Sequence, residues 1–89
     1  MIVRFDKSFG KALDKVKDKS ILKRIENSIL KAEMAESLEE LRGVKKLIGY
    51  TAYYRIKVGD YRIGVEQINS KEIRFVTVLH RKDIYKKFP

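Results

Sequence analysis

The clearest pattern along the chain is a pair of runs, Tyr53–Val58 and Tyr61–Glu66, in which apolar residues alternate with polar or charged ones. Alternation with a period of two is typical of β-strands, whose successive side chains point to opposite faces of a sheet. The two residues between the runs, Gly59 and Asp60, suit a tight turn because glycine accepts a positive φ. The pattern therefore predicts a β-hairpin built around this turn.

The register of this hairpin sorts its residues onto two faces. If the residues that flank the turn pair with each other, Lys57 lies opposite Arg62. One face is then apolar and carries Tyr54, Ile56, Val58, Tyr61, Ile63 and Val65. The other face is cationic and carries Arg55, Lys57 and Arg62 beside a gap at Gly64. Like charges directly opposite each other destabilise a sheet by roughly a few tenths of a kcal/mol or more. A sequence that tolerates them is expected to hold a polyanion there, and the alternative is a solvated face with splayed cations.

The first part of the chain has helical periodicity instead. Phe9, Leu13 and Val16 form one apolar stripe, and Asp6 can cap the N-terminus of this helix. Gly10 weakens the helix but need not break it.

A second helix is predicted after a turn at residues 17–19, with Ser20 as its N-cap. Its apolar stripe consists of Ile21, Ile25, Ile29 and Ala32, supported by Leu22. The remaining face carries charges of both signs. Both apolar stripes are assigned to the core, because neither contains a residue type that needs a chemical explanation.

Shorter runs complete the set of elements. Met1–Phe5 and Val44–Ile48 are predicted strands, and Ile73–Leu79 is so apolar that we expect it to be central in the sheet. Residues 37–41 predict a helical turn, and residues 80–87 predict a short basic, amphipathic terminal helix.

This order of elements predicts a single α+β domain over residues 1–89. We expect an N-terminal strand, an antiparallel helix hairpin packed on a twisted, mostly antiparallel sheet of about four strands, and a short C-terminal helical segment. The first strand is expected beside the apolar strand. The cationic face of the sheet would then be open to a ligand.

The positive charge is concentrated in the second half of the chain. Residues 1–41 contain 9 Lys and Arg against 8 Asp and Glu, whereas residues 42–89 contain 12 against 4. This segregation favours nucleic acid or an acidic protein as the partner. An anionic membrane surface is less favoured because the basic half is predicted to form strands rather than an amphipathic helix.

Several classes of protein and site are excluded or disfavoured. The chain has no cysteine, so disulfides and thiolate metal sites are absent. No apolar run reaches the roughly 18–20 residues of a membrane span, and no signal-peptide core is evident, which is compatible with a cytoplasmic location. There is no cluster of zinc ligands, no glycine-rich nucleotide loop and no serine-hydrolase signature, so we expect no metal and no cofactor.

Three groups of residues are candidates for chemistry on a phosphate chain. Arg55, Lys57 and Arg62 would bind consecutive phosphates, since the arginine fork meets two phosphate oxygens at once. A lysine among other cations is also a candidate general base, because like charges disfavour its protonated form. The second group, just after the apolar strand, contains His80, Arg81, Lys82 and Tyr85, which could move a proton, bind phosphate or stack on a base. The third group, Arg42, Lys45 and Lys46, would form a rim of nonspecific phosphate contacts.

The stretches LRGVKKLIGYTAYYRIKVGDYRIGVEQI and VLHRKDIYKKF together resemble the RelE/ParE superfamily of type II toxin–antitoxin toxins, most specifically from Leu41 to Tyr85. The resemblance implies either of two activities. RelE-like toxins cleave messenger RNA on the ribosome without a metal ion, and ParE-like toxins inhibit DNA gyrase. Both are neutralised by an acidic or amphipathic antitoxin segment, which the resemblance implies as the partner here.

The resemblance also implies roles for individual residues. The catalytic positions of RelE-like toxins correspond here to Arg55 and Lys57, to Arg62, to Arg81 and to Tyr85, and His80 has counterparts in some branches only. The terminal tyrosine favours the ribonuclease branch. We therefore expect a metal-independent endoribonuclease that cleaves messenger RNA through attack of the 2′-hydroxyl. The alternatives are a gyrase inhibitor and a noncatalytic nucleic-acid-binding module.

Overall fold

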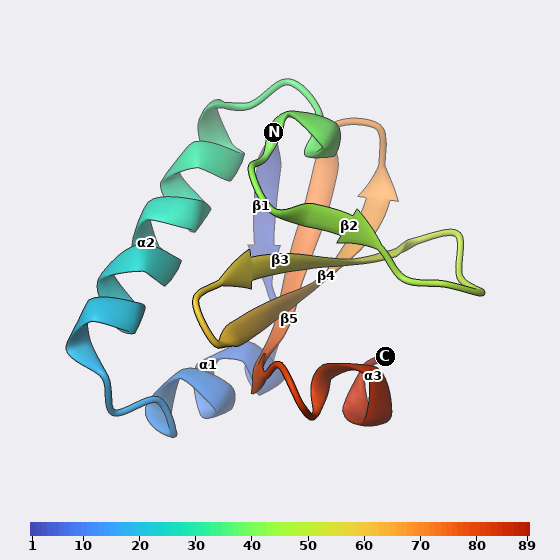
Figure 1. The fold of residues 1–89 in the computed structure, drawn as a ribbon. Helices are drawn as coiled ribbons and strands as arrows, with labels where there is room; N and C mark the ends of the chain where they lie inside the picture. The colour runs from blue at the N-terminus through green and yellow to red at the C-terminus, as the bar shows by residue number, and fades with distance from the viewer.

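The computed structural model describes all residues from Met1 to Pro89 as a two-layer α+β domain. Five strands form one sheet in the order β1-β5-β4-β3-β2. Along the chain the elements are β1 (Ile2–Phe5), α1 (Lys7–Asp14), α2 (Lys19–Met34), the 3₁₀ turn η1 (Leu38–Glu40), β2 (Val44–Lys46), β3 (Tyr53–Val58), β4 (Tyr61–Asn69), β5 (Glu72–His80) and α3 (Ile84–Lys87). Figure 1 shows α2 rising along one side of the sheet and α3 beside the C-terminus on the other. The α+β class and its helix pair are confirmed, and the sheet has five strands where the sequence predicted about four.

The predicted hairpin is confirmed in its register. Val58 pairs with Tyr61, Lys57 with Arg62, and Ile56 with Ile63. Gly59 has a φ of 58°, as the turn requires of its first residue. Local alternation and turn chemistry were therefore sufficient to place these side chains.

The apolar face of the sheet packs under α1 and α2. Ile21 and Ile25 of α2 join Ile56 and Ile63 of the hairpin in one buried cluster. Phe75 of β5 completes it from the neighbouring strand, and its side chain is fully buried. Fully burying an aliphatic or phenylalanine side chain of this size contributes about 1.5–3 kcal/mol relative to leaving it exposed. This shared core holds the opposite face of the hairpin in a defined orientation.

The first strand lies beside the apolar strand, as expected. β1 pairs with β5 in parallel register, with Val3 opposite Ile73 and Phe5 opposite Phe75. β5 is flanked on both sides, while β4 occupies the middle of the sheet. β5 is therefore an interior strand, but it lies one place away from the central position that the sequence predicted for it.

The N-cap of α2 differs from the sequence prediction. Asp18, rather than Ser20, is the capping residue, and its carboxylate accepts hydrogen bonds from the backbone amides of Ser20 and Ile21. Ser20 lies inside the first turn, and its hydroxyl donates to the same carboxylate at 2.7 Å. Aspartate and serine are both good N-caps. Because α2 begins at Lys19, the residue directly before it, Asp18, is the N-cap. The cap predicted at Asp6 is confirmed.

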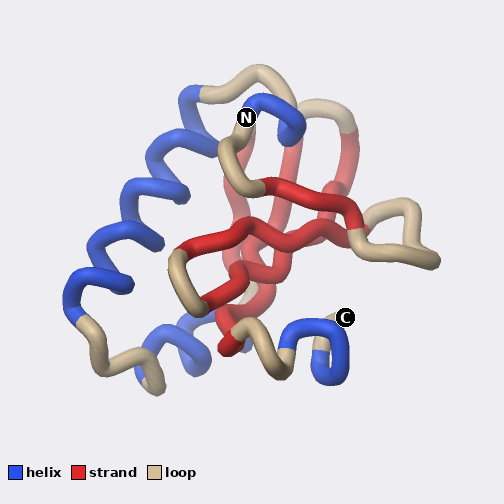
Figure 2. The backbone as a smooth tube through the Cα atoms, in the orientation of Figure 1, coloured by secondary structure: helices blue, strands red, loops and turns tan.

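The strand before the hairpin is shorter than predicted. β2 ends at Lys46, and Leu47 is buried in a separate cluster with Ile84 and Phe88. The chain then leaves the sheet in a projecting loop that Figure 2 shows in tan to the right of β2. Gly49 in this loop has a φ of 87°.

The cationic face of the sheet is not fully open, which corrects the sequence expectation. Phe88 of the C-terminal segment is buried, and its ring covers the gap at Gly64. A Cβ added to Gly64 would lie 3.0 Å from three carbons of that ring. The apolar residues of α3 and Phe88 therefore dock the terminus on this face and leave the end of the hairpin nearest its turn exposed.

Candidate nucleic-acid interface

A cross-strand pair of cations forms the centre of the sheet face opposite α1 and α2, which we call the basic face. Lys57 of β3 and Arg62 of β4 are direct partners in the antiparallel ladder. The side chain of Lys57 is exposed, and that of Arg62 is half-buried. Nη1 of Arg62 donates to the backbone oxygens of Gly59 at 2.8 Å and of Tyr61 at 2.9 Å. The turn therefore holds the guanidinium in place through one of its three nitrogens.

A second arginine on this face is held between two distant segments. Nη1 of Arg55 donates to the backbone oxygen of Gly43 at 2.6 Å. Nε of the same side chain lies 3.4 Å from the hydroxyl of Tyr85 on α3. In the ladder Arg55 lies between Lys45 on β2 and Gly64 on β4. The structure thus brings Arg55, Lys45 and Tyr85 together.

The central cations of the basic face have no carboxylate partners. Ion pairs form elsewhere in the protein, between Arg4 and Glu72, Lys23 and Glu26, and Arg74 and Glu66. None of them includes Arg55, Lys57 or Arg62. The positive charge of the hairpin is therefore available to an external anion, as the sequence interpretation required.

Arg81 lies beside the hairpin turn. Its backbone amide donates to the backbone oxygen of Asp60 at 2.8 Å, and its Nε is 4.0 Å from a carboxylate oxygen of the same residue. Both side chains are more than half exposed, at 59% and 73%. An ion pair at this distance and exposure contributes little, so Arg81 remains free to bind another anion. Lys82 follows in an exposed turn.

His80 lies on the other side of the sheet from Arg62. It pairs with Tyr61, whose ring packs against the core beneath the helices, and the two rings meet edge to face with centroids 5.8 Å apart. Its Nδ1 accepts a hydrogen bond from the backbone amide of Lys82 at 3.2 Å. The ladder partner of Arg62 on β5 is Leu79 instead. The structure therefore does not bring His80 together with Lys57 and Arg62 on the basic face.

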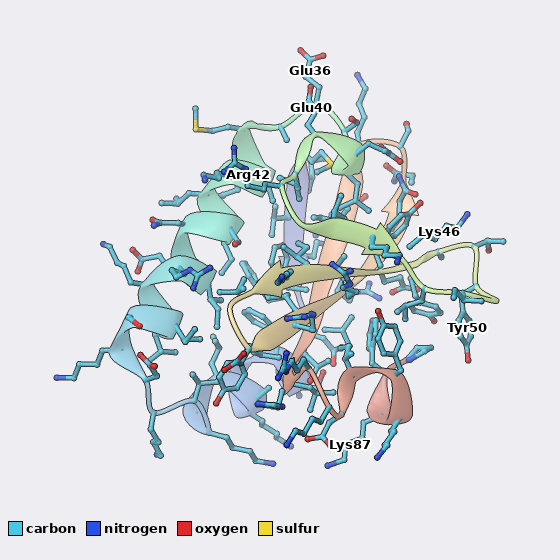
Figure 3. The ribbon with its side chains drawn as sticks, in the orientation of Figure 1. Glu36, Glu40, Arg42, Lys46, Tyr50 and Lys87 are labelled. Atoms are coloured by element: carbon cyan, nitrogen blue, oxygen red, sulfur yellow. The ribbon has the colours of Figure 1, made fainter.

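The three rim residues separate in the same way. Lys45 pairs with Arg55 and shares its face, whereas Lys46 pairs with Tyr54 and takes the opposite face. Arg42 lies before the ladder starts. Figure 3 shows Arg42 beside the upper turns of α2, and Lys46 toward the loop at the far end of β2. Only Lys45 of this group belongs to the basic face.

A pocket next to the basic face is lined in part by residues of α2 that were not among the candidates from the sequence. It has a volume of about 180 Å³ and lies between α2 and the edge of β3. Its lining residues are Arg24, Asn27, Ser28, Lys31, Leu41, Arg42, Ile56, Lys57 and Val58. The four from α2 have the spacing i, i+3, i+4 and i+7, which places them on one helix face. That polar stripe on one helix face was the feature of the sequence that could have indicated the pocket.

Three carboxyl groups have shifted pKa values, and none is on the basic face. The hydroxyl of Ser20 and the adjacent backbone amides hold the pKa of Asp18 below its ordinary value, and the hydroxyl and amide of Ser8 do the same for Asp6. The hydrogen bond from Arg4 lowers the pKa of Glu72. These groups stabilise helix starts and the contact between β1 and β5.

Two other kinds of feature are absent from the structure. No three His, Cys, Asp or Glu side chains are grouped so that they could hold a metal ion. No helix is long and apolar enough to cross a membrane.

Comparison with known proteins identifies relatives over nearly the whole chain. The family model described as "ParE toxin of type II toxin-antitoxin system, parDE" matches residues 3–85. Toxin RelE3 of Methanocaldococcus jannaschii is 48% identical over 90 residues, covering 100% of both chains. A match of this extent relates the two sequences from end to end.

Solved structures agree with this result. The RelB–RelE antitoxin–toxin complex of Methanococcus jannaschii matches with 45% identity and a TM-score of 0.80, over 97% of this chain and 99% of that one. The intact RelBE complex of E. coli matches with 19% identity and a TM-score of 0.66, over 86% and 92% of the two chains. At that identity the second match supports the fold alone.

Proposed function

Because the chain belongs to the ParE toxin family of type II toxin–antitoxin systems and is RelE-like over its full length, we propose that it is an endoribonuclease that cleaves messenger RNA. The observation that carries this proposal is the pair Lys57 and Arg62, two cations held opposite each other without a carboxylate between them. Such a pair is unfavourable in the isolated protein and becomes favourable when a phosphate lies between the two side chains.

The proposed reaction begins with attack of an RNA 2′-hydroxyl on the adjacent phosphorus. Lys57, as the general base, accepts the hydroxyl proton, the bond from phosphorus to the 5′-oxygen breaks, and the departing oxygen takes up a proton from a water molecule. The products are a cyclic phosphate, or the 3′-phosphate formed from it by hydrolysis, and a free 5′-hydroxyl. Lys57 is the better candidate base because His80 lies on the opposite side of the sheet.

Arg62 and Arg81 are proposed to stabilise the negative charge that accumulates on the phosphorane. Donors aimed at such a charge are typically worth roughly 2.7–4 kcal/mol each in other enzymes, or about a hundredfold or more in rate. Arg62 is already held by the turn, so little reorganisation is needed when the phosphate arrives. Arg55 and Lys45 would bind the neighbouring phosphates, and Lys82 would lie at the exposed border.

Tyr85 is proposed to stack on a base or to orient it. Tyr85 is 62% exposed, and its hydroxyl lies beside the guanidinium of Arg55. An exposed ring next to a phosphate-binding cation can contact a base while the cation binds the backbone. Because no efficient acid–base pair is assembled on this face, we expect the ribosome to help position the RNA, and no metal ion to be required.

A cognate antitoxin is the proposed partner. The solved relatives include toxins in complex with RelB antitoxins. On this protein we expect an acidic or amphipathic segment to cover the basic face or to displace residues 81–88. The small cluster of Leu47, Ile84 and Phe88 that docks the terminus is separate from the main core, which favours local displacement.

The proposal is tested by adding the purified protein to a translation reaction and mapping transcript ends. We expect new 5′-hydroxyl ends with the wild type and loss of cleavage on addition of the cognate antitoxin. Because the matching family model is described by the ParE toxin, gyrase inhibition is the second candidate. Inhibition of DNA supercoiling with intact transcripts would establish that candidate and reject the ribonuclease. RNA binding without cleavage or supercoiling inhibition would leave a noncatalytic module.

A further inference from the structure

The pocket between α2 and β3 contains only positive charge. Arg24 and Lys31 project from α2, Arg42 precedes β2, and Lys57 belongs to β3. No aspartate or glutamate lines it. Asn27 adds a further hydrogen-bond donor between the two helix cations, whereas the hydroxyl of Ser28 donates to the backbone oxygen of Arg24 at 3.1 Å. The lining therefore matches an anion with several acceptor oxygens.

The size of the pocket limits what it can hold. Its volume of about 180 Å³ is smaller than the roughly 300–1,000 Å³ of sites that enclose a whole small molecule. Its buried floor consists of Leu41, Ile56 and Val58, and its rim is exposed. The pocket therefore fits an anionic group that is part of a larger molecule, most of which lies outside the pocket.

The pocket and the basic face share one residue and approach the same hairpin turn. Lys57 lines the pocket and is also the ladder partner of Arg62. A Cβ added to Gly59 would lie 3.0 Å from Nη1 of Arg24, so this guanidinium lies against the hairpin turn. Arg62 binds the backbone oxygen of the same glycine. Cations from α2 and from the basic face therefore reach one turn.

We propose that this pocket binds a backbone phosphate of the RNA strand at a position away from the scissile phosphate. The proposal rests on the proposed ribonuclease function, since it assigns the pocket to the same RNA. Arg24 and Arg42 supply forked donors for phosphate oxygens, and Lys31 supplies a point charge. An RNA strand that lies on the basic face with one phosphate beside Lys57 can continue past β3, so that another of its phosphates enters the pocket.

The test measures binding of uncleavable RNA, so it is independent of catalysis. Fluorescent 2′-O-methyl oligonucleotides of about four and about twelve nucleotides are titrated with protein at several salt concentrations. The variant is Arg24→Gln with Lys31→Gln. The matched control is Lys11→Gln with Lys15→Gln, which removes the same charge from exposed positions in and just after α1, outside the pocket. Melting curves establish that both variants fold.

We expect the pocket variant to weaken binding of the longer oligonucleotide by about tenfold. Its salt slope should fall by about 0.7 for each phosphate that the pocket no longer neutralises. Binding of the shorter oligonucleotide should change by less than about twofold, because it cannot occupy both sites. Asn27→Asp should also weaken binding of the longer one, since it places a carboxylate in the pocket without removing a cation. The control should affect both lengths weakly and equally.

Equal losses of affinity in the pocket variant and the control would overturn the proposal, as would a loss that is the same for both oligonucleotides. A peptide of alternating Glu and Leu, about twelve residues long, provides the other arm. If the pocket variant abolishes binding of that peptide and leaves RNA binding unchanged, the pocket is a protein-docking site. If RNA binding depends on the pocket but wild-type protein cleaves no transcript, the ribonuclease proposal fails and the phosphate site remains.

Discussion

The hydroxyl of Tyr85 lies 3.4 Å from Nε of Arg55, although 30 residues separate them along the chain. The contact joins the C-terminal helix to the middle of β3. It places an exposed aromatic ring beside a cation that is also anchored to the backbone oxygen of Gly43. This arrangement allows one segment to contact a base while the sheet binds the phosphate backbone.

Removing the ring of Tyr85 should impair cleavage without affecting stability. Base stacking on an aromatic side chain contributes about 1–3 kcal/mol, so Tyr85→Ala should lower kcat/KM by about tenfold or more. Tyr85→Phe keeps the ring and should retain most of the activity. The measurement is single-turnover cleavage of a defined RNA, with melting temperature as the check on folding.

Tyr50→Ala is the matched control, because Tyr50 is also a half-exposed tyrosine but lies on the projecting loop (Figure 3). It should leave cleavage within about twofold of wild type. If Tyr85→Ala were as active as this control, the proposed stacking role would have to be abandoned.

Arg62→Ala should reduce cleavage by about a hundredfold or more, since it removes a donor to the phosphorane. Arg62→Lys should recover only part of the loss because a lysine cannot reproduce the fork. Transcript ends mapped after induction of each variant provide the measurement. Lys11→Ala, which removes a cation from α1, is expected to cleave like the wild type.

The same Arg62→Ala substitution also removes two hydrogen bonds to the hairpin turn, at Gly59 and Tyr61. At about 0.5–1.5 kcal/mol for each bond, stability should fall by roughly 1–3 kcal/mol. Cleavage is therefore compared well below the melting temperature of Arg62→Ala. Near-normal cleavage by a folded Arg62→Ala protein would contradict its catalytic role.

Gly64→Ala should destabilise the docking of the C-terminal segment. The new methyl group would lie 3.0 Å from the ring of Phe88, and overpacking of this kind typically costs about 1–3 kcal/mol. Chemical denaturation measures the loss. In a Gly64→Ala, Phe88→Ala double variant the clash is absent, so the combined loss should be smaller than the sum of the two single losses. Additive losses would show that the ring does not rest on Gly64 in solution.

Asp18→Asn should make the stability of the protein less dependent on pH in the acid range. The pKa of Asp18 is lowered in the folded protein, chiefly by the hydroxyl of Ser20, from an ordinary value of 3.8. Because the pKa is lower in the folded than in the unfolded protein, the charged carboxylate stabilises the fold at pH values above the pKa of the unfolded protein. This contribution is lost as the pH falls through the lower folded value.

The difference in melting temperature between wild type and Asp18→Asn should therefore be greatest near neutral pH and disappear at the lowest pH at which both still fold. The melting temperature of Ser20→Ala should still depend on pH in the acid range, because the backbone amides of residues 20 and 21 still donate to the carboxylate of Asp18. A constant difference across the whole pH range would indicate that Asp18 does not act through its charge.

The sequence by itself determined the hairpin and which cations lie together on one of its faces. Residues that flank a two-residue turn must pair, and side chains alternate along each strand, so Lys57 and Arg62 had to lie together once the turn was identified. The cap at Asp6 and the interior position of β5 also followed from local chemistry and apolar character. These features depend on neighbours within a few residues of each other.

Only the tertiary structure decided where the remaining candidates lie. β5 carries apolar residues at positions that point to both faces, so its pattern contains no signal for the side on which His80 emerges, and its pairing with Tyr61 places it under the helices. Likewise, Arg24 and Lys57 come from elements with no local relationship and line one pocket only because α2 packs across β3. Periodicity specifies which residues share a face of one element, but contacts between distant elements arise from how a common core brings those faces together.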